Sequence, residues 1–173
     1  MPERVSPVEF VARNGGAVVH RPPVEQDPEA FASAVDADGA WGVGTLVEHR
    51  GRVLLVREGD TWLLPGGLCE PDESHVEGAV RETYEETGLA VRVHDLAAVT
   101  VRTVARGDAT AEFYFATFRA TPAGTDVTPA ADPGLPGEAV DEAAWHRSLP
   151  DATLHRDLLL RLRSGGRRSV RED

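Results

Sequence analysis

Residues 63–89 read LLPGGLCEPDESHVEGAVRETYEETGL, and this stretch contains the clearest structural signals in the chain. Ser74 and Glu77 stand three residues apart in the pattern of a capping box, which satisfies free N–H groups at a helix start. Gly88 stands where a helix usually ends, because glycine adopts the left-handed conformation without strain. The stretch therefore predicts a helix over residues 75–87.

Three glutamates of this helix converge on one face. At about 100° per residue, Glu82, Glu85 and Glu86 fall within an arc of roughly 100°. Glu77, Arg81 and Glu85 alternate in sign, so an ordinary salt-bridged surface is the alternative interpretation. Glu82 and Glu86 do not fit that pattern, because they repel each other at i, i+4 spacing. We therefore expect a hard divalent cation, Mg²⁺ or Mn²⁺, to bind between these carboxylates.

The other positions of the helix complete this prediction. A different stripe is expected to pack into the core; it consists of Val76, Ala79, Val80 and Thr83. Gly78 lies one turn before Glu82 on the carboxylate face and lowers the helix propensity by about 1 kcal/mol relative to alanine. Its missing side chain is expected to leave room for substrate or for further ligands of the ion.

Together these residues resemble the Nudix box, the signature of the Nudix hydrolases. The matching positions, at the family's spacing, are Gly67, Glu73, Arg81-Glu82-Thr83, Glu85-Glu86 and Gly88-Leu89. Thr83 is the only departure, since the family usually has a bulky aliphatic residue there. The resemblance implies an α/β fold, specifically a Nudix-type α/β/α sandwich with a mixed β-sheet. It also implies hydrolysis of the pyrophosphate bond of a nucleoside diphosphate linked to another group.

The resemblance further implies roles for individual residues. Glu82, Glu85, Glu86 and the carbonyl of Gly66 match the metal ligands of the family, and Glu85 and Arg81 are also expected to act in catalysis. Glu73 and Arg81 match the residues that orient the carboxylates.

A carboxylate must also accept the proton of the attacking water, and some family members use a glutamate outside the box. Glu138, seven residues before Trp145, is our candidate for this general base, and Glu112 is the alternative. The long loop over 120–137 is expected to fold the chain back over the helix and to bring Glu138 to the site.

Alternating and apolar runs predict the remaining elements. Around the helix we expect strands over 41–48, 52–57, 61–64, 90–104 and 112–119, a turn at Pro65-Gly66-Gly67, and a last helix that starts at 150–151 and packs through Leu154, Leu158 and Leu162. Residues 41–163 then form the Nudix hydrolase domain. Residues 1–40 form an N-terminal extension of uncertain structure, with a possible strand over 16–19 and a possible helix over 28–35. Residues 164–173 are expected to form a disordered basic tail.

Composition limits the partners and the location. Residues 1–160 carry 27 acidic and 13 basic side chains, a balance of −14, which disfavours binding to duplex nucleic acid. A single cysteine, Cys69, cannot form an internal disulfide, and neither a signal peptide nor a membrane-spanning run is evident. We therefore expect a cytoplasmic protein with a small-molecule nucleotide as its partner, no membrane contact, and a homodimer left open.

The substrate remains the main question. Pro65-Gly66-Gly67 resembles the nucleoside-triphosphate branch of the family, and Ala105 stands where ADP-ribose hydrolases often have proline. A nucleoside triphosphate or related nucleotide is thus expected. The alternatives are an ADP-ribose or dinucleotide pyrophosphatase, or a catalytically silent Nudix-like nucleotide-binding module. Cys69 is interpreted as a loop residue and His75 as an exposed residue at the helix start.

Overall fold

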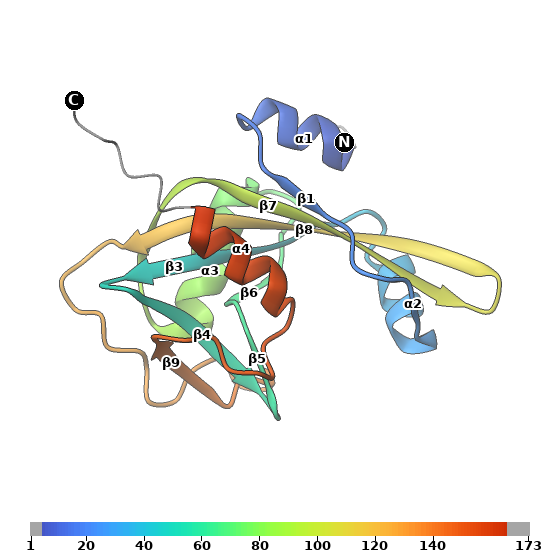
Figure 1. Cartoon of the computed structure of the whole chain (residues 1–173). Helices are drawn as coiled ribbons and strands as arrows, with labels where there is room; N and C mark the ends of the chain where they lie inside the picture. Colours follow the sequence, from blue (N-terminus) through green and yellow to red (C-terminus); the bar gives the residue numbers. More distant parts are fainter. Residues whose placement is uncertain (1–4, 166–173) are drawn as a thin grey trace.

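The computed structural model describes residues 5–165, in which helices lie on both sides of a mixed β-sheet (Figure 1). The helices are α1 (Pro7–Arg13), α2 (Pro28–Asp36), α3 (His75–Thr87) and α4 (Arg156–Gly165). The strands are β1 (Val18–His20), β2 (Glu25–Gln26), β3 (Gly42–His49), β4 (Arg52–Glu58), β5 (Thr61–Leu63), β6 (Gly66–Leu68), β7 (Val91–Arg106), β8 (Ala109–Pro122) and β9 (Glu142–His146).

The sheet divides at β3. This strand runs parallel to β8 and antiparallel to β6, but it pairs with β4 only at the hairpin end, where Glu48 faces Val53 and His49 faces Arg52. β4 then pairs with β5 and β9 instead. The two parts diverge from the hairpin, and the carboxylate-bearing helix α3 contacts the part that contains β3 and β6.

Each face of the sheet is covered by a helix. Val43 packs in one apolar cluster with Ala79 of α3, whereas Leu46 packs in another with Leu158 of α4. Side chains three residues apart on a strand point to opposite faces, so β3 is buried on both sides. The α/β/α sandwich with a mixed sheet, predicted from the resemblance, is confirmed.

The last helix begins later than predicted, at Arg156 instead of at residues 150–151. The preceding segment bonds to β5 instead, since the N–H of Trp62 donates to the carbonyl of Ala152 and the N–H of Leu154 donates to that of Trp62. Leu154 is consequently 49% exposed, and Leu159 takes the buried place expected for it. The helix includes Ser164 and Gly165, while the rest of the predicted tail lies outside the described residues.

The hairpin formed by β7 and β8 is longer than predicted. Register is continuous from Val91 opposite Pro122 to Arg106 opposite Ala109, apart from two bulges, and Gly107 turns the chain with a φ of 61°. From the sequence, the first of these two strands was predicted to end at residue 104 and the second to begin at residue 112. This long hairpin extends away from the rest of the molecule, and α2 lies beside its far half (Figure 1).

The N-terminal segment shares the same sheet. The possible strand and helix within residues 1–40 are found as β1 and α2, and α1 and β2 are additional. β1 and β2 both pair in parallel with β7, and Phe10 of α1 stacks on Trp41 and His75. The boundary between extension and domain stays a prediction. Within residues 5–165, none of the helices has the length and apolar character needed to cross a membrane.

Candidate active site

Local capping fixes the ends of α3 as predicted. The Ser74 side chain accepts a hydrogen bond from the N–H of Glu77, and the Glu77 carboxylate accepts one from the N–H of Ser74. Gly88 ends the helix with a φ of 75°, and its N–H donates to the carbonyl of Tyr84. The helix that carries the carboxylates is therefore held at both ends by residues of its own sequence.

The buried side of α3 differs from the predicted one. Ala79 and Thr83 are fully buried as expected, but Val76 is 41% exposed, while Glu82 and Glu86 are only 8% and 6% exposed. The carboxylate face thus overlaps the core face, because β3 and β6 pack over it. The prediction placed carboxylates and core on separate stripes since it counted only apolar residues as buried.

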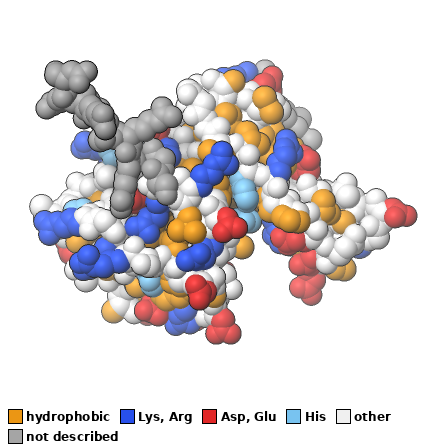
Figure 2. Space-filling model, viewed as in Figure 1, with side chains coloured by type: hydrophobic (Ala, Val, Ile, Leu, Met, Phe, Trp, Pro, Cys, Tyr) orange, Lys and Arg blue, Asp and Glu red, His pale blue; other side chains and the backbone are white. Residues whose placement is uncertain are grey.

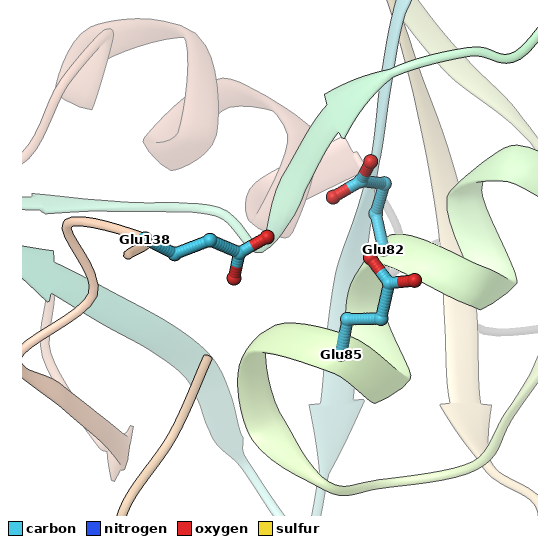
Figure 3. Close-up of side chains that lie close together, drawn as sticks. All are labelled: Glu82, Glu85 and Glu138. Atoms are coloured by element: carbon cyan, nitrogen blue, oxygen red, sulfur yellow. The ribbon is translucent and has the colours of Figure 1, made fainter. Parts of the chain in front are cut away.

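Three carboxylates lie close together beside α3. Glu82 and Glu85 of the helix and Glu138 of the loop between β8 and β9 offer oxygens that all lie within 4.8 Å of one another. Figure 3 shows Glu138 pointing toward the two helical glutamates from the opposite side. The fold thus brings Glu138 to the other two carboxylates, as expected from the sequence. Its role as general base stays a prediction.

Long-range hydrogen bonds hold the loop that carries Glu138. The N–H of Ala130 donates to the carbonyl of Thr87 at 2.9 Å, which ties the loop to the C-terminal end of α3. Trp145 of β9 donates its indole N–H to the carbonyl of Val127 at 2.7 Å. Glu138 itself accepts from the N–H of Leu135 at 2.9 Å. The loop folds back over the helix as the sequence analysis expected.

Arg81 binds several carboxylates at once. Its guanidinium donates to both oxygens of Glu73 at 2.6 and 3.0 Å, to Glu82 at 2.9 Å and to Glu85 at 3.1 Å. A further N–H donates to the carbonyl of Leu68 in β6 at 3.0 Å. Glu73 and Glu82 raise the pKa of Arg81 above its ordinary value, with the bond to Glu73 as the main cause. The fork geometry therefore fixes the two glutamates of the helix against β6.

Glu86 lies apart from the three clustered carboxylates, on the inner side of the site. Its carboxylate accepts a hydrogen bond from the N–H of Gly66 at 3.0 Å. Burial raises its pKa to about 8, and the neighbouring Glu82, Glu58 and Glu138 contribute in the same direction. Burial also raises the pKa of Glu82. A cation that neutralised these groups would remove the cost of ionising them.

The glycines of the site allow close packing. Gly66 and Gly67 belong to strand β6, so the predicted turn is wrong at these positions; they pair with Gly44 and Val43 of β3. A Cβ on Gly67 would stand 2.5 Å from the carboxylate of Glu82.

Gly78 was expected to leave room for ligands, but a Cβ there would meet Glu73 at 2.8 Å and Val43 at 3.1 Å. This glycine thus lets α3 approach its neighbours instead of opening space for substrate.

Thr83, the one departure from the resembled pattern, has a partner in the core. Its hydroxyl lies 2.7 Å from that of Thr45 on β3, and it donates to the carbonyl of Ala79 at 2.7 Å. Both threonines are fully buried. A hydrogen-bonded threonine pair thus joins helix and strand at this position.

Other sequence candidates lie outside the carboxylate cluster. Glu112 is exposed near the far end of the β7–β8 hairpin and accepts from the hydroxyl of Tyr114. His75 is half-buried instead of exposed, between Phe10 and Trp41, and burial lowers its pKa. Cys69 follows β6 as a loop residue, and burial raises the pKa of its thiol, which disfavours the nucleophilic thiolate form.

The residues present fit a divalent metal ion. Carboxylate oxygens are hard ligands, and one arginine among the clustered glutamates leaves an excess of negative charge that an ion would balance. Burial is the main cause of the raised pKa values of Glu82 and Glu86, and neighbouring carboxylates raise them further. The arrangement can therefore bind a cation and place carboxylates around a polyphosphate.

A cavity of about 170 Å³ opens on the α4 side of β6. We call it the α4 cavity. The rings of Phe113 and Phe115 line it together with Arg102, His155 and Gly66, and the remaining lining is mostly leucine and threonine. An apolar cavity with aromatic rings and a few donors suits a flat heterocycle. The sequence analysis missed this site, because its walls come from β7, β8 and the segment before α4.

A family model described as "NUDIX domain" matches residues 39–160. Among curated proteins, a "MutT-like protein" of Streptomyces ambofaciens is 47% identical over 58 residues, which cover 32% of this chain and 38% of that protein. "Diphosphoinositol polyphosphate phosphohydrolase 2" of Mus musculus is 49% identical over 45 residues, 24% of this chain and 25% of that protein. The chain thus spans less than two fifths of the length of these relatives.

Solved structures show the same fold. An ADP-ribose pyrophosphatase from Streptococcus suis 89-1591 superposes with a TM-score of 0.55 at 19% identity, covering 75% of this chain and 93% of that one. The MutT NUDIX hydrolase from Burkholderia pseudomallei gives a TM-score of 0.55 at 22% identity, covering 71% and 96%.

Proposed function

The chain belongs to the NUDIX family, and from this premise we propose that it hydrolyses the pyrophosphate bond of a nucleoside diphosphate derivative in a metal-dependent reaction. The observation that supports this most directly is the meeting of Glu82, Glu85 and Glu138 within 4.8 Å. Two of these come from the helix and the third from a loop more than fifty residues away. A salt-bridged surface along the helix would not require the carboxylate of Glu138 at this place.

Glu82, Glu85, Glu86 and the carbonyl of Gly66 would hold the metal ion, for which we propose Mg²⁺, with Mn²⁺ as a substitute. When bound, such an ion supplies charge neutralisation on the pyrophosphate oxygens and acidifies water. Arg81 keeps Glu82 and Glu85 in place through its bonds to both, and Glu73 in turn holds the guanidinium. The positioning roles of Arg81 and Glu73 rest on these contacts, and the ligand set is the one that the resemblance to the family implies.

Glu138 is the proposed general base. As a water oxygen forms its bond to phosphorus, the bridging phosphorus–oxygen bond breaks, and one water proton passes to the carboxylate of Glu138. The N–H of Leu135 donates a hydrogen bond to one oxygen of the Glu138 carboxylate, and the Glu138 side chain reaches the cluster from outside the helix. Glu85 belongs to the same carboxylate cluster as Glu138, and its negative charge would help to hold the cation there.

For the substrate, the sequence favours a nucleoside triphosphate or related nucleotide, and the α4 cavity supports a nucleoside. Its two phenylalanine rings offer faces for a base, beside the strand whose Gly66 binds Glu86. ADP-ribose or a dinucleotide is the second candidate. The expected cytoplasmic location and a possible homodimer stay predictions, which microscopy of a tagged protein and light scattering would test.

Exchange of the proposed base tests the mechanism. We expect Glu138→Gln to lower kcat by about 10²–10⁴-fold with little change in KM, because the lost group acts mainly in the transition state. Release of phosphate or nucleotide from a panel of nucleotides with Mg²⁺ is the measurement. Glu112→Gln is the matched control and should retain activity. Equal activity of Glu138→Gln and the wild type across pH would remove Glu138 from the mechanism.

A further inference from the structure

Arg57, near the end of β4, binds the chain segment that follows Glu138. Its main chain pairs with Trp62 of β5 on one side and with Glu142 of β9 on the other. The loop that carries Glu138 leads directly into β9. Arg57 therefore lies where that loop returns to the sheet.

The guanidinium of Arg57 bonds to both neighbouring segments. It donates to the carbonyl of Gly59 at 2.7 Å and to the carboxylate of Glu142 at 3.3 Å, and Oδ2 of Asp141 lies 3.7 Å away. The same Asp141 oxygen accepts the N–H of Gly59 at 2.8 Å. The N–H of Asp141 donates to the carbonyl of Arg57, also at 2.8 Å. Residues 141 and 142 are thus held through main chain and side chains together.

These contacts differ from those of an ordinary surface ion pair. Figure 2 shows basic and acidic side chains beside one another over the lower part of the molecule, which carries β4 and β9, and exposed pairs of that kind contribute little to stability. Arg119 and Asp95, 3.1 Å apart, form such a pair, and the side chain of Arg119 is 33% exposed against 32% for Arg57. Arg57, by contrast, also binds backbone groups of Gly59 and Asp141. Arg119 therefore provides a matched control for Arg57.

Two residues separate Glu138 from Asp141. On its N-terminal side, Glu138 is bonded within its own turn: its N–H donates to the carbonyl of Leu135 at 3.0 Å, and its carboxylate accepts the N–H of Leu135. Such a local turn shapes the chain but does not attach it to the sheet. On the C-terminal side, Val140 is 8% exposed and Asp141 is bonded to Arg57. The place of Glu138 relative to α3 therefore depends on how firmly residues 140–142 are held.

We propose that Arg57 is a positioning residue for Glu138. By holding residues 141 and 142, it keeps the Glu138 carboxylate beside the two clustered carboxylates of α3. This inference rests on the proposed function, in which Glu138 is the general base. A base must lie within hydrogen-bond reach of the water that it deprotonates, and a displacement of about 1 Å can lower the rate about 10²-fold. Loss of the Arg57 contacts should therefore slow the reaction and leave the metal ligands on α3 and β6 in place.

Removal of the guanidinium tests this inference by kinetics. We expect Arg57→Gln to lower kcat by about 10–100-fold, with KM and the Mg²⁺ concentration for half-maximal rate within about twofold of the wild type. Arg57→Lys keeps the positive charge and should recover part of the rate. Arg119→Gln, the matched control, should keep wild-type values. Wild-type kcat in Arg57→Gln, or a loss of the same size in Arg119→Gln, would overturn the proposal.

A double variant shows whether Arg57 acts through Glu138. Once the base has been removed, its position no longer matters, so Arg57→Gln should change the residual kcat of Glu138→Gln by less than about twofold. A merely structural role would lower the rate by the same factor in both backgrounds. Equal factors in the wild type and in Glu138→Gln would therefore count against the positioning role.

Amide hydrogen exchange gives a readout without catalysis. In Arg57→Gln, the hydrogen-bonded amides of Leu135, Glu138 and Asp141 should exchange at least about tenfold faster than in the wild type, while those of α3 keep their protection. Unchanged exchange at these three amides would overturn the proposal. If Arg57→Gln fails to fold by circular dichroism, Asp141→Ala replaces it, because it removes the acceptor of the Gly59 N–H and should give the same pattern at Leu135 and Glu138.

The outcomes separate this inference from the proposed function. A wild type that hydrolyses no nucleotide, or a fully active Glu138→Gln, would contradict the proposed function, and hydrogen exchange then still decides whether Arg57 holds Glu138 in place. An active enzyme that is slowed by Glu138→Gln but not by Arg57→Gln would overturn the positioning role alone.

Discussion

At the scale of single residues, the most informative group is Glu86, a buried carboxylate whose only described hydrogen bond comes from a backbone N–H. Its pKa is about 8 in the folded protein, against an ordinary value of 4.5. A carboxyl group with a raised folded-state pKa favours folding at low pH, and this contribution disappears as pH rises through the folded pKa. When no cation is bound, the buried Glu86 therefore lowers the free energy of unfolding at neutral and alkaline pH.

This linkage makes a prediction for Glu86→Gln. Without metal, the melting temperature of the wild type should fall between pH 5 and pH 8.5, and that of Glu86→Gln should fall less, because glutamine never ionises. Turnover of the variant should drop by at least about 10²-fold, since a ligand charge is lost. Calorimetry in EDTA and phosphate release at saturating Mg²⁺ measure the two effects. Parallel melting curves against pH, or turnover within a factor of three of the wild type, would contradict the assignment of Glu86.

At the scale of elements, the C-terminal end of α3 both stops the helix and binds the loop that carries Glu138. Gly88 stops the helix with a φ of 75°, and the adjacent Thr87 carbonyl receives the N–H of Ala130 from the loop that carries Glu138. A Cβ on Gly88 would stand 3.1 Å from the Cβ of Ala130. The cap of the helix and the position of the loop are therefore coupled.

Exchange of this glycine should show the coupling. We expect Gly88→Ala to lower the free energy of unfolding by about 1 kcal/mol or more, because alanine is strained in the left-handed region. Gly124→Ala, in the same loop but with open space around it and no left-handed φ, should have little effect. Urea unfolding followed by fluorescence compares the two. A loss of stability no greater in Gly88→Ala than in Gly124→Ala would show that the cap is not under conformational constraint.

At the scale of the whole molecule, stability should depend on the cation. A ligand that binds only the folded state raises the melting temperature by mass action. Millimolar Mg²⁺ should therefore raise the melting temperature of the wild type. At pH 6 this rise should be larger in the wild type than in a variant that lacks the Glu82 carboxylate. The shift should also grow from pH 6 to pH 8, because the ion competes with protons on Glu82 and Glu86. The absence of any shift in a differential scanning experiment would favour a catalytically silent nucleotide-binding module.

The sequence by itself determined the helix of residues 75–87, its caps and the proximity of Glu82 and Glu85, because these depend on hydrogen bonds and side-chain spacing within a few residues. The resemblance carried by the same stretch implied the sandwich. The prediction was wrong where tertiary packing overrides local pattern. Val76 is exposed while two glutamates are buried, and residues 150–155 bond to β5 instead of starting a helix.

Only the tertiary structure decided which groups surround the carboxylates. Glu138 was one of two candidates in the sequence, and the choice depends on hydrogen bonds between residues far apart, such as that of Ala130 with Thr87. The α4 cavity depends on how β7 and β8 carry Arg102 and Phe113 to one face and on how the segment that holds Leu154 and His155 packs against them. No local periodicity encodes such contacts, because they arise from the pairing of distant strands, whereas a helix is specified by neighbours along the chain.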